Sequence, residues 1–242
     1  MDDKDKELEG KLNEIVKSVG DTGFIIANPE TIKRLKDRGL PFQSRFITYK
    51  EYLDKLFEDK RKLAEEIIND LPLINNEIAY SAVQSLYEQV RECYALGIFG
   101  ATITLSSVLL ELSLKYKLHK ERTKSDPNYK WEEIEKLNFT GTLSGLKKIG
   151  VLSQEEWDVL NNFNLEIRNP YIHYNIKKLV RDVMIRELPV VKIETGEKKI
   201  HKDVKIVERS YLWFTGKKFL DKAQVNHVLN FCIGWVNKIL SN

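Results

Sequence analysis

Hydrophobic residues recur at helical spacing over most of the chain after about residue 78. Apolar positions three and four residues apart form one stripe on a helix, so this pattern predicts a series of amphipathic helices. The segment from Ala101 to His119 is apolar on nearly all sides at its start, which is typical of the central helix of a bundle. A last helix is predicted from about Asp221 to Leu240. The pattern therefore predicts a mainly α fold.

Shorter helices are predicted before and between these two. They share the same periodicity and cover about 78–96, 131–150, 153–167 and 169–187, with a split of the second near Thr140 and Gly141 as an alternative. Ser153 and Glu156 have the spacing of a capping box, which marks the start of the third of them. The charged segment 120–130 contains a proline between Asp126 and Asn128 and predicts a loop.

Two regions depart from the helical pattern. Residues 190–194 and 204–208 alternate between apolar and polar side chains around a Thr-Gly-Glu turn at 195–197, which predicts a β-hairpin inserted at about 189–215. Residues 1–77 predict a small N-terminal α/β appendage of unknown role. Its expected elements are a charged helix, short strands at 23–27 and 44–48, a helix from Pro29 to about Arg38, and a surface helix over 49–69 that opens with a Thr48 and Glu51 capping box.

Composition changes this picture little. The 242 residues are 42% hydrophobic and 31% charged, and 39 basic residues stand against 36 acidic ones, so the net charge of +3 does not decide for or against a nucleic-acid partner. Cys93 and Cys232 lie far apart among apolar residues, which suits reduced thiols in a cytoplasmic protein and provides no zinc framework. No segment has the length of a membrane span, and the charged start from Met1 to Lys6 is unlike a secretory signal.

One short stretch carries candidate chemistry. Arg168 and His173 are five residues apart, and on an unbroken helix their directions would differ by about 140°. Asn169 precedes Pro170, so Asn169 is predicted to be an N-cap and Pro170 the first helical residue. Arg168 would then lie just outside the helix and His173 in its first turn, where both side chains can address one phosphate.

Two segments of the chain resemble the HEPN superfamily, including its uncharacterised prokaryotic members. One is Arg91–Ile103 followed by Leu109–Leu112, which is similar to the helix pair that opens such bundles. The other is Arg168–His173, which matches the Arg-x4-His signature with a polar residue after the arginine. The resemblance covers about residues 78–242. It implies an antiparallel helical bundle, a metal-independent endoribonuclease without a cofactor, and a homodimer that brings two motifs together across a cleft.

The chemistry of such an enzyme assigns a role to each residue of the motif. RNA cleavage needs a base for the 2′-hydroxyl, an acid for the leaving oxygen and a cation for the charged phosphate. His173 is expected to transfer protons, Arg168 to hold phosphate oxygens, and Asn169 to orient the phosphate or cap the helix. The expected substrate-binding residues follow the proline: Tyr171, Tyr174, Asn175 and Lys177.

Each of these residues also has a structural alternative. Arg168 can form an ion pair with Glu111, an acid on an otherwise apolar helix that needs a partner. His173 can be an ordinary histidine at a helix start, the two tyrosines can belong to the core, and Lys177 can be solvated surface.

The alternatives extend to function. A non-catalytic HEPN-like module that binds a nucleotide, RNA or a protein keeps the fold without the chemistry, and an unrelated helical adaptor keeps neither. A role in toxin–antitoxin systems or antiviral defence, with an antitoxin or other regulatory protein as partner, follows from the family analogy alone.

Overall fold

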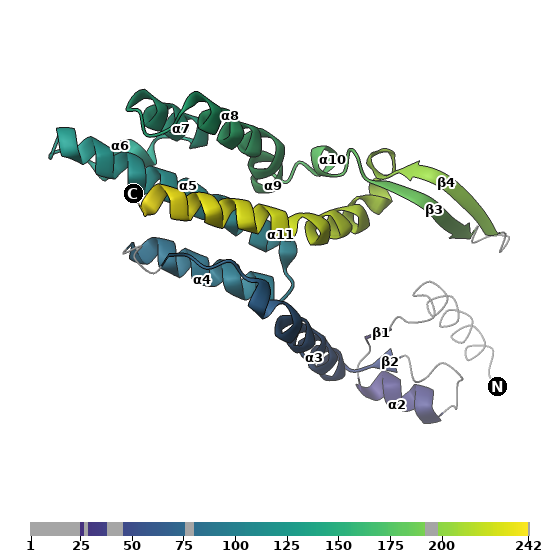
Figure 1. Cartoon of the computed structure of the whole chain (residues 1–242). Coiled ribbons are helices and arrows are strands. Elements are labelled where there is room, and N and C mark those ends of the chain that lie inside the picture. Colours follow the sequence, from purple (N-terminus) through teal and green to yellow (C-terminus); the bar gives the residue numbers. More distant parts are fainter. Residues whose placement is uncertain (1–24, 27–28, 38–45, 76–79, 192–197, 242) are drawn as a thin grey trace. The chain divides into compact units, whose positions relative to one another are not determined.

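The computed structural model describes residues 25–26, 29–37, 46–75, 80–191 and 198–241. They are mainly helical, as the hydrophobic pattern predicts, with one antiparallel hairpin and one short parallel strand pair (Figure 1). The chain divides into two compact units, Met1–Glu66 and Ile67–Asn242. Among the described helices, none combines the length and the apolar character that crossing a membrane requires.

The N-terminal unit contains the predicted α/β elements. Strand β1 (Ile25–Ile26) pairs in parallel with β2 (Phe46–Ile47), and α2 (Pro29–Asp37) lies between them in sequence. Helix α3 (Tyr49–Ile67) starts at the predicted capping box, where Thr48 and Glu51 each accept the backbone N–H of the other. No residue of α3 is buried, as expected for a surface helix. The predicted charged N-terminal helix falls outside the described residues.

Residues 67–75 belong to the second unit rather than to the appendage. Leu71 and Ile74 are buried in the core of the bundle. The backbone N–H of Asn75 donates to Oδ1 of Asn237 at 2.8 Å. Nδ2 of Asn237 donates to the carbonyl of Leu73 at 3.0 Å. The segment that follows α3 is therefore tied to the last helix of the chain.

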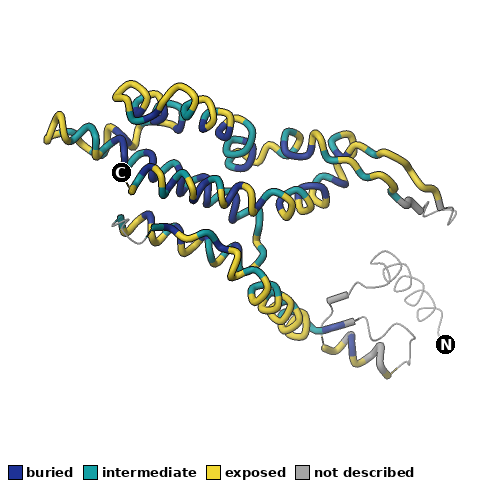
Figure 2. The backbone as a smooth tube through the Cα atoms, viewed as in Figure 1, coloured by how far each residue is buried: buried dark blue, intermediate teal, exposed yellow. Residues whose placement is uncertain are grey.

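Five helices build the bundle: α4 (Ser81–Ala95), α5 (Phe99–Ser125), α7 (Phe139–Lys148), α8 (Gln154–Phe163) and α11 (Trp213–Leu240). Helices α5 and α11 lie side by side, with α4 on one face and the α7–α8 pair on the other (Figure 1). Figure 2 shows that buried residues concentrate on α5 and α11. The predicted central helix is therefore present, and it shares the centre with the last helix.

The directions of these helices are mixed rather than uniformly antiparallel. The start of α5 at Gly100 lies against the start of α11 at Lys217, and a cavity near their far ends is lined by Lys117 and Lys238. These two central helices therefore run in the same direction, whereas α4 and α8 run against them (Figure 1).

Several predicted boundaries are wrong. Helix α4 begins at Ser81 with Tyr80 as N-cap. Helix α5 extends to Ser125 and includes half of the predicted loop. A break at 136–138 separates α6 (Trp131–Glu135) from α7. Helix α11 begins at Trp213, well before Asp221. A Cβ on Gly216 would lie 2.6 Å from Ile206, so only glycine lets the helix start so close to the preceding turn.

The helix predicted over 169–187 is also wrong. Helix α9 spans only Asn169–Ile172, Tyr174 adopts a left-handed conformation (φ 48°), and α10 (Ile176–Leu179) is a single turn. Strand β3 (Met184–Val191) then pairs antiparallel with β4 (Lys198–Lys205), from Met184↔Lys205 to Val191↔Lys198. The hairpin exists as predicted but begins earlier, and the second strand ends before the helical turn Ile206–Glu208. Its predicted turn at 195–197 lies outside the described residues.

Candidate functional site

The motif lies on a helix that continues from α8 rather than at a new helix start. Residues Asn164–Arg168 form a π-helical turn between α8 and α9, and the N–H of Asn169 donates to the carbonyl of Asn164, five residues before it. Pro170 has no N–H for the carbonyl four residues before it, and a wider turn accommodates that loss. Arg168 and Asn169 both have helical backbone angles. The prediction that Asn169 is an N-cap, with Arg168 outside the helix, is therefore wrong.

Arg168 is bound to the central helix. Its Nη2 donates to the carboxylate of Glu111 on α5, its Nη1 donates to Oδ1 of Asn169 at 2.9 Å, and its guanidinium lies 5.2 Å from the centre of the Phe139 ring. The side chains of Arg168 and Glu111 are 14% and 15% exposed. The structure therefore has the ion pair that the acid on the apolar helix suggested as an alternative role for Arg168. The amide of Asn169 is bound to this arginine as well.

His173 has the opposite environment. It is the C-terminal residue of the α9 turn, where its N–H donates to the carbonyl of Asn169 at 3.0 Å, and its side chain is exposed. Among the described residues, the imidazole has no hydrogen-bond or ion-pair partner. The motif therefore presents one side chain to solvent and holds the other against α5.

Tyr171 belongs to a buried polar cluster that the sequence did not indicate. The residue is 4% exposed, and its hydroxyl donates to Oδ1 of Asp221 at 2.7 Å. The second carboxylate oxygen accepts from Nζ of Lys217 at 2.6 Å, and that ammonium lies 4.9 Å from the centre of the Tyr171 ring. Burial, and then the hydrogen bond to the Asp221 carboxylate, raise the pKa of the Tyr171 hydroxyl far above its ordinary value.

A cavity of about 450 Å³ borders this cluster. Its walls come from α5, from the α9 turn and from α11, and its lining residues are Gly100, Ala101, Thr104, Leu105, Tyr171, Tyr174 and Lys217. Tyr174 is 58% exposed, and the Lys217 ammonium lies 5.7 Å from the centre of its ring. Gly100 is required here, because a Cβ would lie 2.7 Å from Oδ2 of Asp221 and 3.0 Å from Nζ of Lys217.

Sequence reasoning missed Lys217 and Asp221 because the last helix was predicted to begin too late. With the helix starting at Trp213, the two residues are four apart on one face, the usual spacing of a helical ion pair. That spacing was the signal in the sequence. Nothing local indicates that Tyr171, fifty positions away, completes the cluster.

The remaining predicted substrate residues have varied environments. Asn175 caps the next turn, accepting the N–H of Lys178 at 3.2 Å through its side chain. Lys177 is exposed, with its ammonium 5.6 Å from the centre of the Trp213 ring. Lys178 and Arg181 both bind Glu166, at 3.2 and 2.8 Å. Hydrogen bonds from Lys178 and then from Arg181 hold the pKa of the Glu166 carboxyl below its usual value. These two cations are therefore paired.

Comparisons of the chain with family models, with curated proteins and with solved structures gave no match. The resemblance to the HEPN superfamily therefore depends on the motif and the helix order of this chain alone.

Proposed function

We propose that the chain is a metal-independent endoribonuclease of HEPN type with His173 as its proton-transfer residue. The observation that carries the proposal is an exposed imidazole, without a hydrogen-bond or ion-pair partner among the described residues, in a stretch whose Tyr171 and Tyr174 both line the cavity. A histidine titrates near neutral pH, so it can accept a proton from the 2′-hydroxyl or donate one to the leaving oxygen. Because His173 directly precedes Tyr174, which lines the cavity, the proposal places the phosphate of a nucleotide bound there at this imidazole.

In this proposal Arg168 is a positioning residue. Its guanidinium is bound to Glu111, so it holds the α9 turn, and with it His173, against α5. Lys177 is the exposed cation of the same stretch and supplies positive charge for the phosphate. The resemblance adds a homodimer and an antitoxin or other regulatory protein in toxin–antitoxin or antiviral defence. The two separate cysteines add a cytoplasmic location, and all of these belong to the proposal as well.

One observation favours a second candidate, a non-catalytic module that binds RNA or a nucleotide. The ion pair between Arg168 and Glu111 takes the arginine away from the role that the Arg-x4-His signature implies for it. The cavity and its aromatic wall would then serve binding without cleavage.

The test is RNA cleavage by purified protein in EDTA. His173→Ala is expected to lose activity by about 10²- to 10⁴-fold, the usual contribution of a positioned acid or base. His227→Ala is the matched control, because His227 is an exposed histidine on α11. Undiminished cleavage by the His173 variant would remove it from the mechanism. Wild-type protein that binds RNA and does not cleave it would leave the second candidate.

A further inference from the structure

The cavity beside Tyr174 has the dimensions and the walls of a site for a small aromatic ligand. Its volume of about 450 Å³ lies within the range of known ligand pockets. Gly100, Ala101 and Leu105 give it an apolar floor on α5, and the exposed Tyr174 ring forms one side. Such a site accepts a flat, mostly apolar group that stacks on the tyrosine.

The charges around the cavity argue against a phosphate as its occupant. Among the described residues that line the cavity, Lys217 alone is basic, and its ammonium already binds the Asp221 carboxylate at 2.6 Å. The pair has no net charge, and a phosphate placed on Lys217 would face that carboxylate. An uncharged group with a hydrogen-bond acceptor at its edge has no such repulsion, because the ammonium has three donors and Asp221 takes one.

We propose that this cavity binds an unpaired nucleobase of RNA, stacked on Tyr174 and accepting a hydrogen bond from Lys217. The ligand class rests on the proposed function, since single-stranded RNA is recognised by stacking unpaired bases on aromatic side chains and by hydrogen bonds to their edges. Guanine presents two neighbouring acceptors, O6 and N7, to a lysine, whereas adenine replaces O6 with an amino donor. The geometry of the donor therefore favours guanine over adenine.

Binding to the full chain is measured by calorimetry with guanosine monophosphate, adenosine monophosphate and inorganic phosphate as ligands. Wild-type protein is expected to bind guanosine monophosphate more tightly than adenosine monophosphate and to show no comparable affinity for phosphate. Equal binding of phosphate and of guanosine monophosphate would overturn the proposal, because the cavity would then bind a phosphate group.

Two variants test the site without touching the buried ion pair. Tyr174→Ala is expected to weaken nucleotide binding by about 5- to 150-fold, the effect of losing one stacked base. The matched control is Tyr211→Ala, since Tyr211 is an exposed tyrosine outside the lining. Ala101→Phe fills the cavity from α5 and is expected to reduce binding at least as much. If Tyr174→Ala and Ala101→Phe both have the melting temperature of the wild type and bind the nucleotide as tightly as the wild type does, the cavity is not the nucleotide-binding site.

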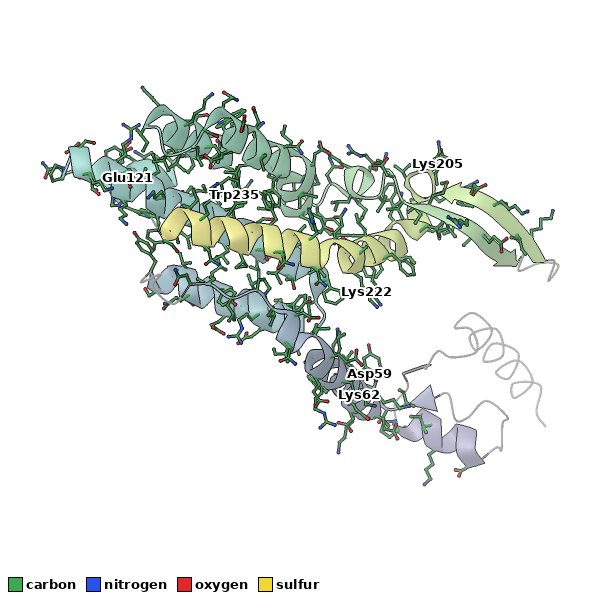
Figure 3. The ribbon with its side chains drawn as sticks, in the orientation of Figure 1. Asp59, Lys62, Glu121, Lys205, Lys222 and Trp235 are labelled. Carbon is green, nitrogen blue, oxygen red and sulfur yellow. The ribbon has the colours of Figure 1, made fainter. Side chains whose placement is uncertain are left out.

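A third variant tests the donor. Lys217→Met is expected to remove the preference for guanine over adenine, with the Tyr174 contact still present. Lys222→Met is its control, because Lys222 is an exposed lysine on the same helix (Figure 3). An unchanged preference in Lys217→Met would contradict the assigned hydrogen bond.

These measurements separate the inference from the proposed function. His173→Ala is expected to keep nucleotide binding and to lose cleavage, which supports both. Nucleotide binding that depends on Tyr174, in a wild-type protein that cleaves no RNA, supports the cavity and removes the nuclease. Cleavage that depends on His173, without Tyr174-dependent binding, keeps the nuclease and overturns the cavity.

Discussion

Two buried ion pairs lie in the bundle, one between the α9 turn and α5 and the other within α11, and they differ in what surrounds them. Arg168 and Glu111 are packed against the Phe139 ring. Lys217 and Asp221 are slightly less exposed, yet they border a cavity of about 450 Å³ and contact two tyrosines. A buried charge by itself therefore does not mark a site. A candidate site is marked by open space beside the charge and by the groups that face that space.

The two residues of the motif also differ in their surroundings. Arg168 and His173 were predicted to address one phosphate, but the π-helical turn before Pro170 keeps the arginine within the helix and against α5. His173 ends the next turn in solvent. A spacing in sequence determines how far apart two side chains lie along a helix, whereas partners on other helices determine what each of them binds.

The largest expected effect comes from breaking the first pair. Glu111→Met leaves the Arg168 side chain, which is only 14% exposed, without its carboxylate and is expected to lower the free energy of unfolding by about 3 kcal/mol. Arg168→Met is expected to cost less, because Glu111 keeps Lys115 at 3.3 Å. Urea unfolding of both single variants and of the double variant measures how much the ion pair contributes to the free energy of unfolding.

The double variant with methionine at both positions is the control for that prediction. Replacing a whole buried pair by apolar residues is often neutral, so it is expected to recover most of the loss. A double variant as unstable as the sum of the singles would show that the two residues act independently.

Crowding the second pair is expected to have an intermediate effect. Gly100→Ala places a Cβ 2.7 Å from Oδ2 of Asp221, and that carboxylate cannot move without losing Tyr171 or Lys217. The expected loss of stability is about 1–3 kcal/mol, as for other overpacked interiors. Gly234→Ala on α11 is the matched control, since its Cβ meets nothing within 4 Å, and it should stabilise the helix by about 0.5–1 kcal/mol. Equal thermal unfolding of the two variants would contradict the close approach.

The smallest effect is a loss of folding stability at alkaline pH. Of the two pairs, only the second is expected to show it, because its Asp221 accepts the hydrogen bond of Tyr171. The pKa of Tyr171 is raised in the folded protein, so the unfolded chain loses this proton near pH 10 while the folded chain keeps it. Stability from this group is therefore complete below about pH 10 and falls above it, by at most about 1.4 kcal/mol per pH unit. Tyr171→Phe should make the fall between pH 9 and 11 shallower in urea titrations, and an identical slope would contradict the cluster.

The fold was predictable where a local pattern decides it. The apolar faces of α5 and α11 and the two capping boxes, at Thr48 and Ser153, have local signals and are present. Prediction failed where packing decides. Gly216 lets α11 start early against Ile206, and the left-handed Tyr174 ends a helix that periodicity would continue.

The candidate site divides in the same way. Glu111 was identifiable as a partner for Arg168, since an acid on an apolar helix needs one. The cap expected at Asn169 followed from the local Asn-Pro step, but the turn is determined by how α8 continues into it. The contact of Tyr171 with Asp221 joins residues fifty positions apart, and only the packed bundle brings them together.

RNA cleavage in EDTA by the double variant Glu111→Met with Arg168→Met tests the account most directly, at a temperature where it is folded. If Arg168 only positions the turn, two methionines packed between α9 and α5 hold the turn as well, so the folded variant cleaves at a rate close to wild type, while His173→Ala in the same assay does not. If the variant is folded, binds RNA and is as inactive as His173→Ala, the arginine contacts the phosphate itself, and the distinction between the two ion pairs is wrong.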